Sequence, residues 1–422
     1  KPNPSLHSCP YSYSHANAHC WWNRELLRQG MGTWRRYVSV GSEGDGRARL
    51  EREADFKSLL SQYRDFEALL KRHKGMAIPD LYKTQSYDYL LPEELIAQSP
   101  IEPRDASRLM VLRRNEGTVE HRRFRDIVEY LDPGDLLVAN DTRVIPARLR
   151  GKKGSGGEVE IFLLAPLDEE SKKWKALVRP GRRVRAGQLI FLDCGIRVAI
   201  ESDLPEGIRV VSFPDEVDVR ALLKEFGEVP LPPYIRKKDL PFERYQTVFA
   251  KNDGSVAAPT AGLHFTEALM ASLRQKGVML AWITLHVGLG TFRPVKVTDI
   301  KAHTMHAERY EIPPEVAEQI AKTKGKGKRV VAVGTTVVRC LESAALKNGS
   351  VMSGPGIASL FIYPGFQFHI VDALITNFHL PKSTLLMLVT AFAGYENIMK
   401  AYQIAVNERY RFFSFGDAML IL

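Results

Sequence analysis

Hydrophobic positions follow different periods in different parts of the chain. Between about residues 150 and 240, short apolar runs are separated by Gly, Pro and Asp, which is typical of β-strands joined by tight turns. The runs lie at 159–164, 175–178, 189–192, 197–200 and 209–213. This spacing predicts a small antiparallel β-barrel or sandwich inserted in the chain. A proline-rich run at 229–234 cannot continue regular structure and predicts a connector.

After residue 255, apolar residues recur every three to four positions between short continuous apolar runs. This periodicity predicts helices at 266–276, 314–324, 336–346, 383–392 and 395–409, and strands at 278–285, 329–333 and 371–375. Residues 135–149 add two strands around a turn. Strands that alternate with helices predict an α/β fold, a mixed sheet with flanking helices, whose site lies at the strand ends.

These patterns divide the chain into three expected parts. Residues 1–80 form an atypical N-terminal extension, partly helical or disordered, with helical spacing at 51–74 and Met76 as a plausible start. Residues 81–149 and 241–422 form an α/β catalytic domain, in which Pro92 and the two glutamates after it predict the start of a helix. Residues 150–240 form the β-barrel insertion domain.

Composition narrows the class of protein. The 422 residues are 45% hydrophobic and 26% charged, which suits a chain with more than one core. No run approaches the roughly 18 apolar residues of a membrane span, so no membrane is expected. The four cysteines form no CxxC pair, which disfavours a disulfide framework, a zinc site or an iron–sulfur cluster and favours the cytoplasm. The net charge of +10 suits a polyanionic partner, but it is also within ordinary scatter.

Two loops of small residues contain a histidine each. The first, 256–265, includes Thr260, Gly262 and His264, and small residues there let a ligand approach the backbone. The second, 284–292, places His286 and Gly288 at the end of a predicted strand, where α/β sheets bind ligands. The alternatives are a tight turn with a hydrogen-bonded histidine and a β-bulge.

A third motif, at 330–342, runs from strand through Gly into a helix that begins with Thr335 and Thr336. A helix N-terminus of this kind can hold a carboxylate or phosphate. Arg339 and Glu342 lie one turn further and can share a helix face with Thr335. The alternative is a capped helix with a surface ion pair.

The remaining motifs are histidine- and arginine-rich. His303, His306 and Glu308 lie close in sequence, but without HExxH spacing an acid/base pair is favoured over a metal site. Asn377 and His379 follow a strand and are placed to hydrogen-bond a base edge or a ribose, although helix capping also explains this loop. Arginines and aromatics alternate at 408–417, where RNA contact competes with a core role for the phenylalanines.

Taken together, these blocks resemble the S-adenosylmethionine:tRNA ribosyltransferase-isomerase family of queuosine biosynthesis. The matching text includes PGDLLVANDTRVIPAR at 133–148, AAPTAGLHF at 257–265, TLHVG at 284–288, VGTT at 333–336, TNFHLP at 376–381 and YRFFSFGDAM at 410–419. The resemblance runs from about residue 87 to the last residue, and residues 1–80 depart from it.

The resemblance implies a two-domain α/β enzyme with a β-barrel insertion. It implies S-adenosylmethionine as co-substrate, no metal, and a tRNA partner that carries 7-aminomethyl-7-deazaguanine at the anticodon wobble position. The product base would be epoxyqueuosine, with adenine and methionine released. A monomer is the family-level expectation.

The chemistry of this family suggests roles for the motif residues. An acid/base pool is expected to comprise His264, His286, His306 and His379, because imidazole titrates near neutral pH. Asp141 and Glu308 are expected to orient these histidines or hold ribose hydroxyls. Thr335, Thr336 and Arg339 are expected to hold the methionine carboxylate or an RNA phosphate. The other expected substrate-binding residues are Thr260, Gly262, Gly288, Glu342, Asn377 and Arg143.

Two other functions remain open from the residues alone. A non-catalytic RNA-binding protein would use the barrel as a platform for the nucleic acid. An ordinary methyltransferase is disfavoured because no glycine-rich loop follows a first strand.

Overall fold

The structure is a computed structural model that describes residues 79–237, 241–288, 295–346 and 348–422. The expectations for residues 1–78, including the helix at 51–74 and the start at Met76, therefore lie outside the described residues. None of the helices in these ranges is long and apolar enough to cross a membrane.

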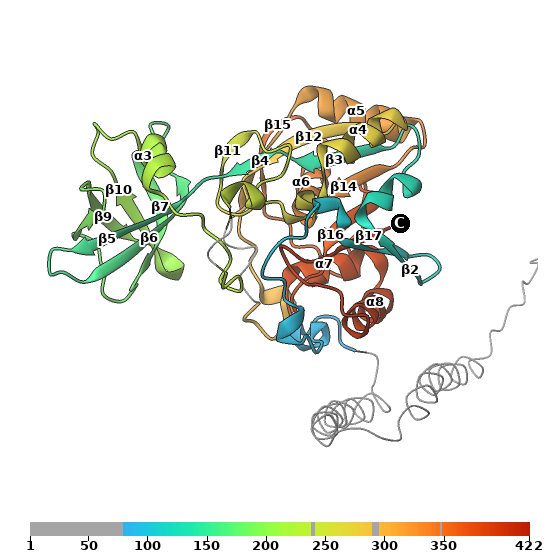
Figure 1. Ribbon diagram of the computed structural model, residues 1–422, viewed down its shortest axis with the longest axis horizontal. Helices are drawn as coiled ribbons and strands as arrows, with labels where there is room; N and C mark the ends of the chain where they lie inside the picture. Colours follow the sequence, from blue (N-terminus) through green and yellow to red (C-terminus); the bar gives the residue numbers. More distant parts are fainter. Residues whose placement is uncertain (1–78, 238–240, 289–294, 347) are drawn as a thin grey trace, which may run out of the picture. The chain divides into compact units, whose positions relative to one another are not determined.

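The main body is built on a nine-stranded mixed sheet in the order β15-β13-β12-β3-β14-β16-β17-β1-β2 (Figure 1). Strands β12, β3, β14 and β16 run parallel, whereas β17 runs antiparallel to β16. The strand bounds are β1 Arg108–Arg113, β2 Thr118–Arg123, β3 Leu136–Asn140, β12 Met279–Leu285, β13 Glu308–Ile312, β14 Val330–Val333, β15 Gly354–Ala358, β16 Ala373–Asn377 and β17 Ala418–Ile421. The four parallel strands place their carboxyl ends at one edge of the sheet, so the expected mixed sheet is confirmed.

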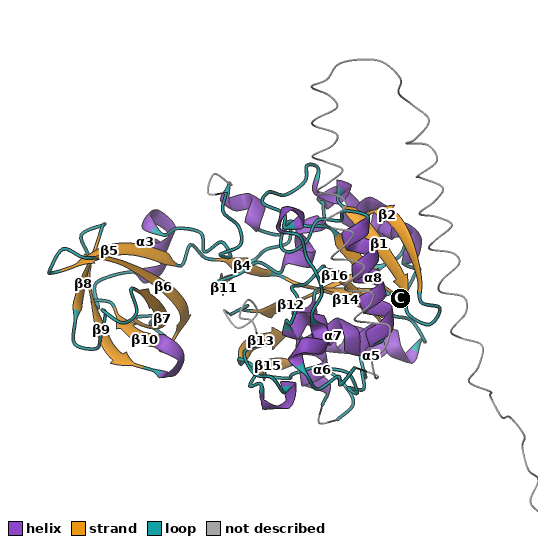
Figure 2. Cartoon of the chain, turned by 90° about the horizontal axis from the view of Figure 1, so that it is seen from below, coloured by secondary structure: helices purple, strands orange, loops and turns teal. Residues whose placement is uncertain are grey.

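Helices cover both faces of this sheet, as Figures 1 and 2 show. The core on one face includes apolar residues of α5 Pro314–Gly325, α6 Thr335–Ala345, α7 Thr384–Ala393 and α8 Tyr395–Asn407. The core on the other face includes those of α4 Glu267–Gln275 and of the 3-10 helices η4 Phe124–Tyr130 and η7 Thr260–His264. Because helices cover it from both sides, β3 and β14 are buried at every position, as expected for central parallel strands.

Local sequence explains where the helices begin. Thr266 caps α4 by accepting from the Leu269 N–H, and Ser383 caps α7 by accepting from the Leu386 N–H. The helix predicted at Pro92 is instead a single 3-10 turn, because the chain returns to extended backbone at Ile96. That turn is η2 Glu93–Leu95, and the remaining 3-10 turns of the described residues are η1 Thr84–Tyr87, η3 Arg104–Ala106, η5 Pro205–Gly207, η6 Phe242–Tyr245 and η9 Ile300–Ala302.

The inserted part is a closed antiparallel barrel in the order β10-β7-β6-β5-β8-β9. Its strands are β5 Arg148–Lys153, β6 Glu158–Pro166, β7 Lys173–Arg179, β8 Leu189–Leu192, β9 Arg197–Asp203 and β10 Ile208–Ser212. Alternate strand positions and α3 Val219–Phe226 form its core. The expected barrel is confirmed. The sixth strand, β5, and α3 were not predicted, because β5 is short of apolar residues and α3 is only two turns long.

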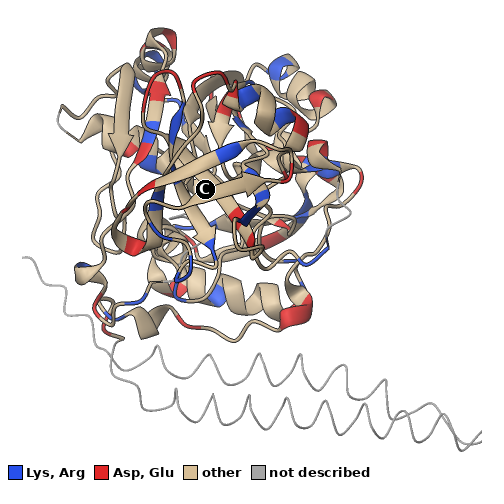
Figure 3. Cartoon of the chain, turned by 90° about the vertical axis from the view of Figure 1, so that its left-hand side faces the viewer, with Lys and Arg blue, Asp and Glu red and all other residues tan. Residues whose placement is uncertain are grey.

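Two short strands, β4 Thr142–Val144 and β11 Asn252–Ser255, pair with each other beside the carboxyl edge of the main sheet. Basic and acidic residues are interspersed in the described part of the chain, as Figure 3 shows. The net positive charge therefore does not collect on one face in that view.

Candidate functional site

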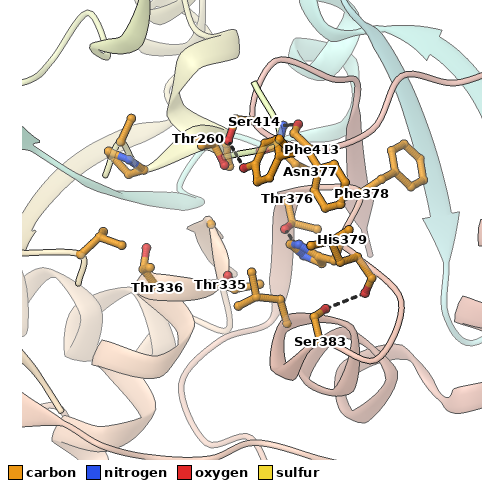
Figure 4. Close-up of a pocket in the computed structure, with 18 residues that line it drawn as sticks. Thr260, Thr335, Thr336, Thr376, Asn377, Phe378, His379, Ser383, Phe413 and Ser414 are labelled. Atoms are coloured by element: carbon orange, nitrogen blue, oxygen red, sulfur yellow. Dashed lines mark hydrogen bonds between the residues drawn. The ribbon is translucent and has the colours of Figure 1, made fainter. Parts of the chain in front are cut away.

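A pocket opens at the carboxyl ends of β14 and β16 (Figure 4). The start of α6, the η7 turn and the chain after β16 form its walls, together with residues near Phe413 and the connector residue Tyr234. It is lined by Tyr234, Ala258, Pro259, Thr260, Ala261, Val287, Gly334, Thr335, Thr336, Thr376, Asn377, Phe378, His379, Leu380, Ser383, Leu385, Phe413 and Ser414. Among these described residues there is no lysine, arginine, aspartate or glutamate, so the described lining combines apolar side chains with uncharged polar ones.

The N-terminus of α6 supplies the donors of one wall. Gly334 has φ +94°, a conformation that glycine adopts without strain, and its N–H donates to the Ile375 carbonyl at 2.8 Å. This turn directs the first N–H groups of α6 toward the pocket, where they have no partner within the helix. The hydroxyls of Thr335 and Thr336 also line the pocket, and within the described residues neither makes a hydrogen bond. The predicted anion cradle therefore faces the cavity.

His379 is the imidazole that the described residues bring to the pocket wall. The backbone N–H of His379 donates to the Tyr402 hydroxyl at 2.9 Å, and its backbone carbonyl accepts from the Tyr89 hydroxyl. Its Nε2 lies 2.9 Å from the Thr376 hydroxyl, and its Nδ1 has no partner in the described part of the chain. Burial lowers the pKa of His379 to about 3. The ring is therefore neutral near pH 7 and is held as a proton or hydrogen-bond acceptor.

His264 does not line this pocket, but it lines a second, smaller pocket together with Ser107, Arg104 and Ser414. Its ring stacks on Phe124, with ring centroids 4.9 Å apart, and is hydrogen-bonded to Ser107 and Asn377. Burial, and to a smaller extent the charges of Arg411 and Arg104, lower the pKa of His264 to about 3. Asn377 lies between His264 and the first pocket, and the acid/base role expected for His264 stays a prediction.

Asp141 and His286 both lie beside the pocket, near β4 and β11. The Asp141 carboxylate accepts from Asn252 Nδ2 at 3.1 Å and from the Thr284 hydroxyl at 2.7 Å. His286 Nδ1 is 2.9 Å from the Thr142 hydroxyl. Burial lowers the pKa of His286, and the Asp141 charge opposes that shift. These contacts join the two short strands to β12, and neither side chain lines the cavity.

Arg339 and Glu308 form a buried ion pair with 2.6 Å between Nη1 and Oε2. Glu308 also accepts from the Gly288 N–H at 3.0 Å, and Arg339 donates to the carbonyls of Leu360 and Ala358. The Arg339 guanidinium is thus already bonded within the protein and does not line the pocket, so the expectation that it holds the methionine carboxylate or an RNA phosphate stays a prediction without a contact to support it. This pair joins α6 to β13 and β15.

The Glu342 carboxylate, like Arg339, is bonded within the protein. Its two carboxylate oxygens accept from the N–H groups of His369, Ile370 and Val371, at 2.9, 3.1 and 3.0 Å. The surface ion pair of Arg339 and Glu342 is not formed, because both side chains are buried and bond to different segments. Glu342 thus holds the chain that enters β16 and does not reach the pocket.

The other predicted residues divide between wall and periphery. Thr260 and Asn377 line the pocket. Gly262 packs against Thr247 and Phe249, and any Cβ there would come within 2.8 Å of both. The remaining predictions lie outside the cavity: Arg143 pairs with Glu243 and Asp253, and His306 and Gly288 do not line it. No group of three or more His, Cys, Asp or Glu that could hold a metal ion is found in the residues the structure describes.

Sequence reasoning did not single out several wall residues. Tyr234 lies in the proline-rich connector, and Phe413 was assigned to the core. Ser383 was interpreted as a helix cap, and Thr376 and Ser414 were given no role because single hydroxyl residues carry no sequence signal. One signal was present for Ser414: it belongs to the arginine–aromatic motif, whose loop returns to the pocket beside β16.

Comparisons with known proteins give the family. The sequence model of the family described as queuosine biosynthesis protein matches residues 84–421. An S-adenosylmethionine:tRNA ribosyltransferase-isomerase of Thermosipho africanus is 57% identical over 340 residues, 80% of this chain and 99% of that protein. A protein of Moorella thermoacetica with the same name is 54% identical over 343 residues, 81% of this chain and 100% of that protein. The crystal structure of an S-adenosylmethionine tRNA ribosyltransferase from Thermotoga maritima shares 44% identity, covers 80% of this chain and 100% of its own, and has a TM-score of 0.46. The chain therefore belongs to the queuosine biosynthesis protein family.

Proposed function

We propose that this chain is an S-adenosylmethionine:tRNA ribosyltransferase-isomerase. It transfers the ribosyl part of S-adenosylmethionine to 7-aminomethyl-7-deazaguanine at the anticodon wobble position of tRNA and isomerises it, giving epoxyqueuosine and releasing adenine and methionine. Relatives with this name, 54% or more identical along almost their whole length, support the proposal. We also propose that the protein is a monomer, that it acts in the cytoplasm and that it needs no metal.

The observation that carries the proposal is the pocket at the carboxyl ends of β14 and β16, whose described lining has no lysine, arginine, aspartate or glutamate. S-adenosylmethionine has a carboxylate at one end and a sulfonium in its middle. The N–H groups and dipole of the α6 N-terminus, with the hydroxyls of Thr335 and Thr336, suit the carboxylate. The absence of cations from the described lining leaves the sulfonium unopposed by like charge.

His379 is the proposed proton acceptor in this pocket. A sulfonium acidifies the neighbouring ribose C5′–H, and a positioned neutral base can remove that proton to form an ylide. His379 is neutral because burial lowers its pKa to about 3, and its Nδ1 is available among the described residues.

The test is direct. The chain is incubated with S-adenosylmethionine and with tRNA that carries 7-aminomethyl-7-deazaguanine, and the nucleosides are examined by mass spectrometry. We expect the epoxycyclopentane adduct on the base, together with free adenine in equal amount.

Two controls define failure. The same tRNA without the aminomethyl group should give neither adduct nor adenine. S-adenosylmethionine labelled in its methyl group should leave all label on methionine; label on the RNA would replace the proposal with a methyltransferase, and binding without adenine release would leave a non-catalytic RNA-binding protein.

A further inference from the structure

Phe413 has an unusual backbone for a residue on the pocket wall. Its φ of +69° lies in the left-handed region, which bulky side chains occupy only where surrounding contacts hold them, often at functional sites. Its ring lines the pocket and stacks on the ring of Tyr234, with centroids 4.7 Å apart and planes 27° apart. The Tyr234 hydroxyl is 2.7 Å from the Ser414 hydroxyl, which fixes the second ring. The two rings form one aromatic wall.

Three polar side chains behind this wall are hydrogen-bonded in a row that ends on the Phe413 carbonyl. Asn377 Nδ2 donates to that carbonyl at 3.1 Å and lies 3.1 Å from His264 Nε2. His264 Nδ1 lies 2.7 Å from the Ser107 hydroxyl. All three side chains are at least 96% buried. We call Ser107, His264 and Asn377 the buried chain.

The proton positions in the buried chain follow from one atom. The Phe413 carbonyl can only accept, so the nitrogen of the Asn377 amide, and not its oxygen, must face it. The same nitrogen then donates to His264 Nε2, which must be unprotonated. The proton of His264 is therefore on Nδ1 and is donated to Ser107.

This arrangement fixes geometry. Both Asn377 N–H hydrogens and the His264 Nδ1 hydrogen have acceptors in the row, and the Asn377 amide between His264 and the pocket-wall residue Phe413 does not titrate. The Phe413 carbonyl also accepts from the Gly416 N–H at 2.9 Å, and the Phe413 N–H donates to the Phe378 carbonyl at 3.2 Å. Both peptide groups of Phe413 are thus held, as a left-handed residue requires.

We propose that Tyr234 and Phe413 are the stacking wall for a planar purine-like ring of the substrate, and that the buried chain positions this wall. The proposal rests on the proposed function, in which two such rings enter the site: the adenine of S-adenosylmethionine and the 7-deazaguanine base of tRNA. Aromatic faces bind either ring, because stacking tolerates differences in ring identity. His264 is then a positioning residue.

Binding of each substrate alone tests the wall. The dissociation constants of S-adenosylmethionine and of an anticodon stem-loop carrying the modified base are measured by calorimetry for wild type, Phe413→Ala and Phe413→Tyr. We expect Phe413→Ala to weaken one of them about tenfold or more, as for a lost base–aromatic stack, while Phe413→Tyr stays within about threefold. Phe226→Ala removes an exposed phenylalanine at the end of α3 and should change neither constant.

The ligand whose binding is weakened in Phe413→Ala carries the ring that stacks on the wall. If neither dissociation constant changes in Phe413→Ala, the stacking wall is refuted. This readout needs no turnover, so it is independent of the proposed function, which fails instead if wild-type protein forms no adduct on tRNA.

Kinetics test the buried chain. His264→Ala should raise KM for the ligand identified above, and His264→Gln should restore it, because Gln can still accept from Asn377. The pH–rate profile should keep its shape in both variants. The double variant His264→Ala, Phe413→Ala should bind that ligand no more weakly than Phe413→Ala alone. Loss of an ionisation from the profile, or multiplied effects in the double variant, would overturn the positioning role. Ser107→Ala, a smaller change, gives the same two readouts if His264→Ala does not fold.

Discussion

The carboxyl edge of the main sheet has two halves that differ in their charged side chains. In the half formed by β14 and β16, the described residues around the pocket contain no charged side chain. In the half formed by β3, β12 and β13, Asp141, Glu308 and Arg339 are all engaged by protein groups. Because a paired, hydrogen-bonded charge cannot also bind substrate without losing its partner, the difference indicates that the second half supports the first.

We expect the largest effect from a substitution in the pocket, and we expect it on turnover. His379→Ala removes the proposed proton acceptor and should lower kcat by about 10²- to 10⁴-fold, the usual range for a general base. The measurement is single-turnover release of adenine. His369→Ala, an exposed histidine outside the pocket, is the matched control. Unchanged adenine release in His379→Ala would remove this residue from the mechanism.

Breaking the buried ion pair should affect stability more than chemistry. Arg339→Met leaves Glu308 without its 2.6 Å partner and should lower the free energy of unfolding by about 3–5 kcal/mol, measured in urea. The double variant Arg339→Met, Glu308→Leu should recover part of that loss. If Arg339→Met instead keeps its stability and raises KM for S-adenosylmethionine strongly, the arginine binds substrate and the two halves are not distinct.

The helix start should affect binding of S-adenosylmethionine. Thr335→Val and Thr336→Val each remove a hydroxyl donor to the proposed carboxylate and should raise KM for S-adenosylmethionine about tenfold, because such charge-assisted bonds contribute roughly 1.5–3 kcal/mol. Thr390→Val, in a buried threonine of α7, should leave that KM unchanged. Equal values in all three variants would place the carboxylate elsewhere.

The smallest effect concerns acid stability. The folded pKa of about 3 for His264 and His379 lies below the value of about 6.5 for unfolded histidine. Between these values the unfolded chain binds more protons, so the stability contribution is complete above about pH 6.5 and is lost as the pH falls toward about 3. When the pH is lowered from about 6 to about 5, the free energy of unfolding measured in urea should therefore fall by about 1 kcal/mol less in His264→Gln than in wild type. Equal losses would show that His264 is not held neutral.

Strong periodicity made the architecture predictable from the sequence. The segments at 314–324 and 336–346 repeat apolar residues at helical spacing, and both are helices within one or two residues. Strand β5 was missed because four of its six residues are Arg or Lys, and its place is decided by pairing with β6 and β8. Tertiary pairing of this kind has no local signature.

The candidate site was predictable only where backbone chemistry defines it. Gly334, Thr335 and Thr336 were placed correctly on the pocket because a strand, a glycine and a helix start determine where N–H groups point. The contacts of Arg339 were not predicted because sequence spacing shows which helix face a side chain occupies but not which carboxylate faces it. The role of Phe413 was hidden since its left-handed backbone depends on contacts distant in sequence.

The absence of charged side chains from the described pocket lining predicts how ionic strength affects binding. Mobile ions screen interactions between charged groups, and the described pocket lining has no charged side chain. Added potassium chloride should therefore scarcely alter the affinity for S-adenosylmethionine. A polyanion that condenses counterions behaves in the opposite way, and its affinity falls steeply with salt. A titration of salt would therefore separate the two substrates by their response to the medium alone.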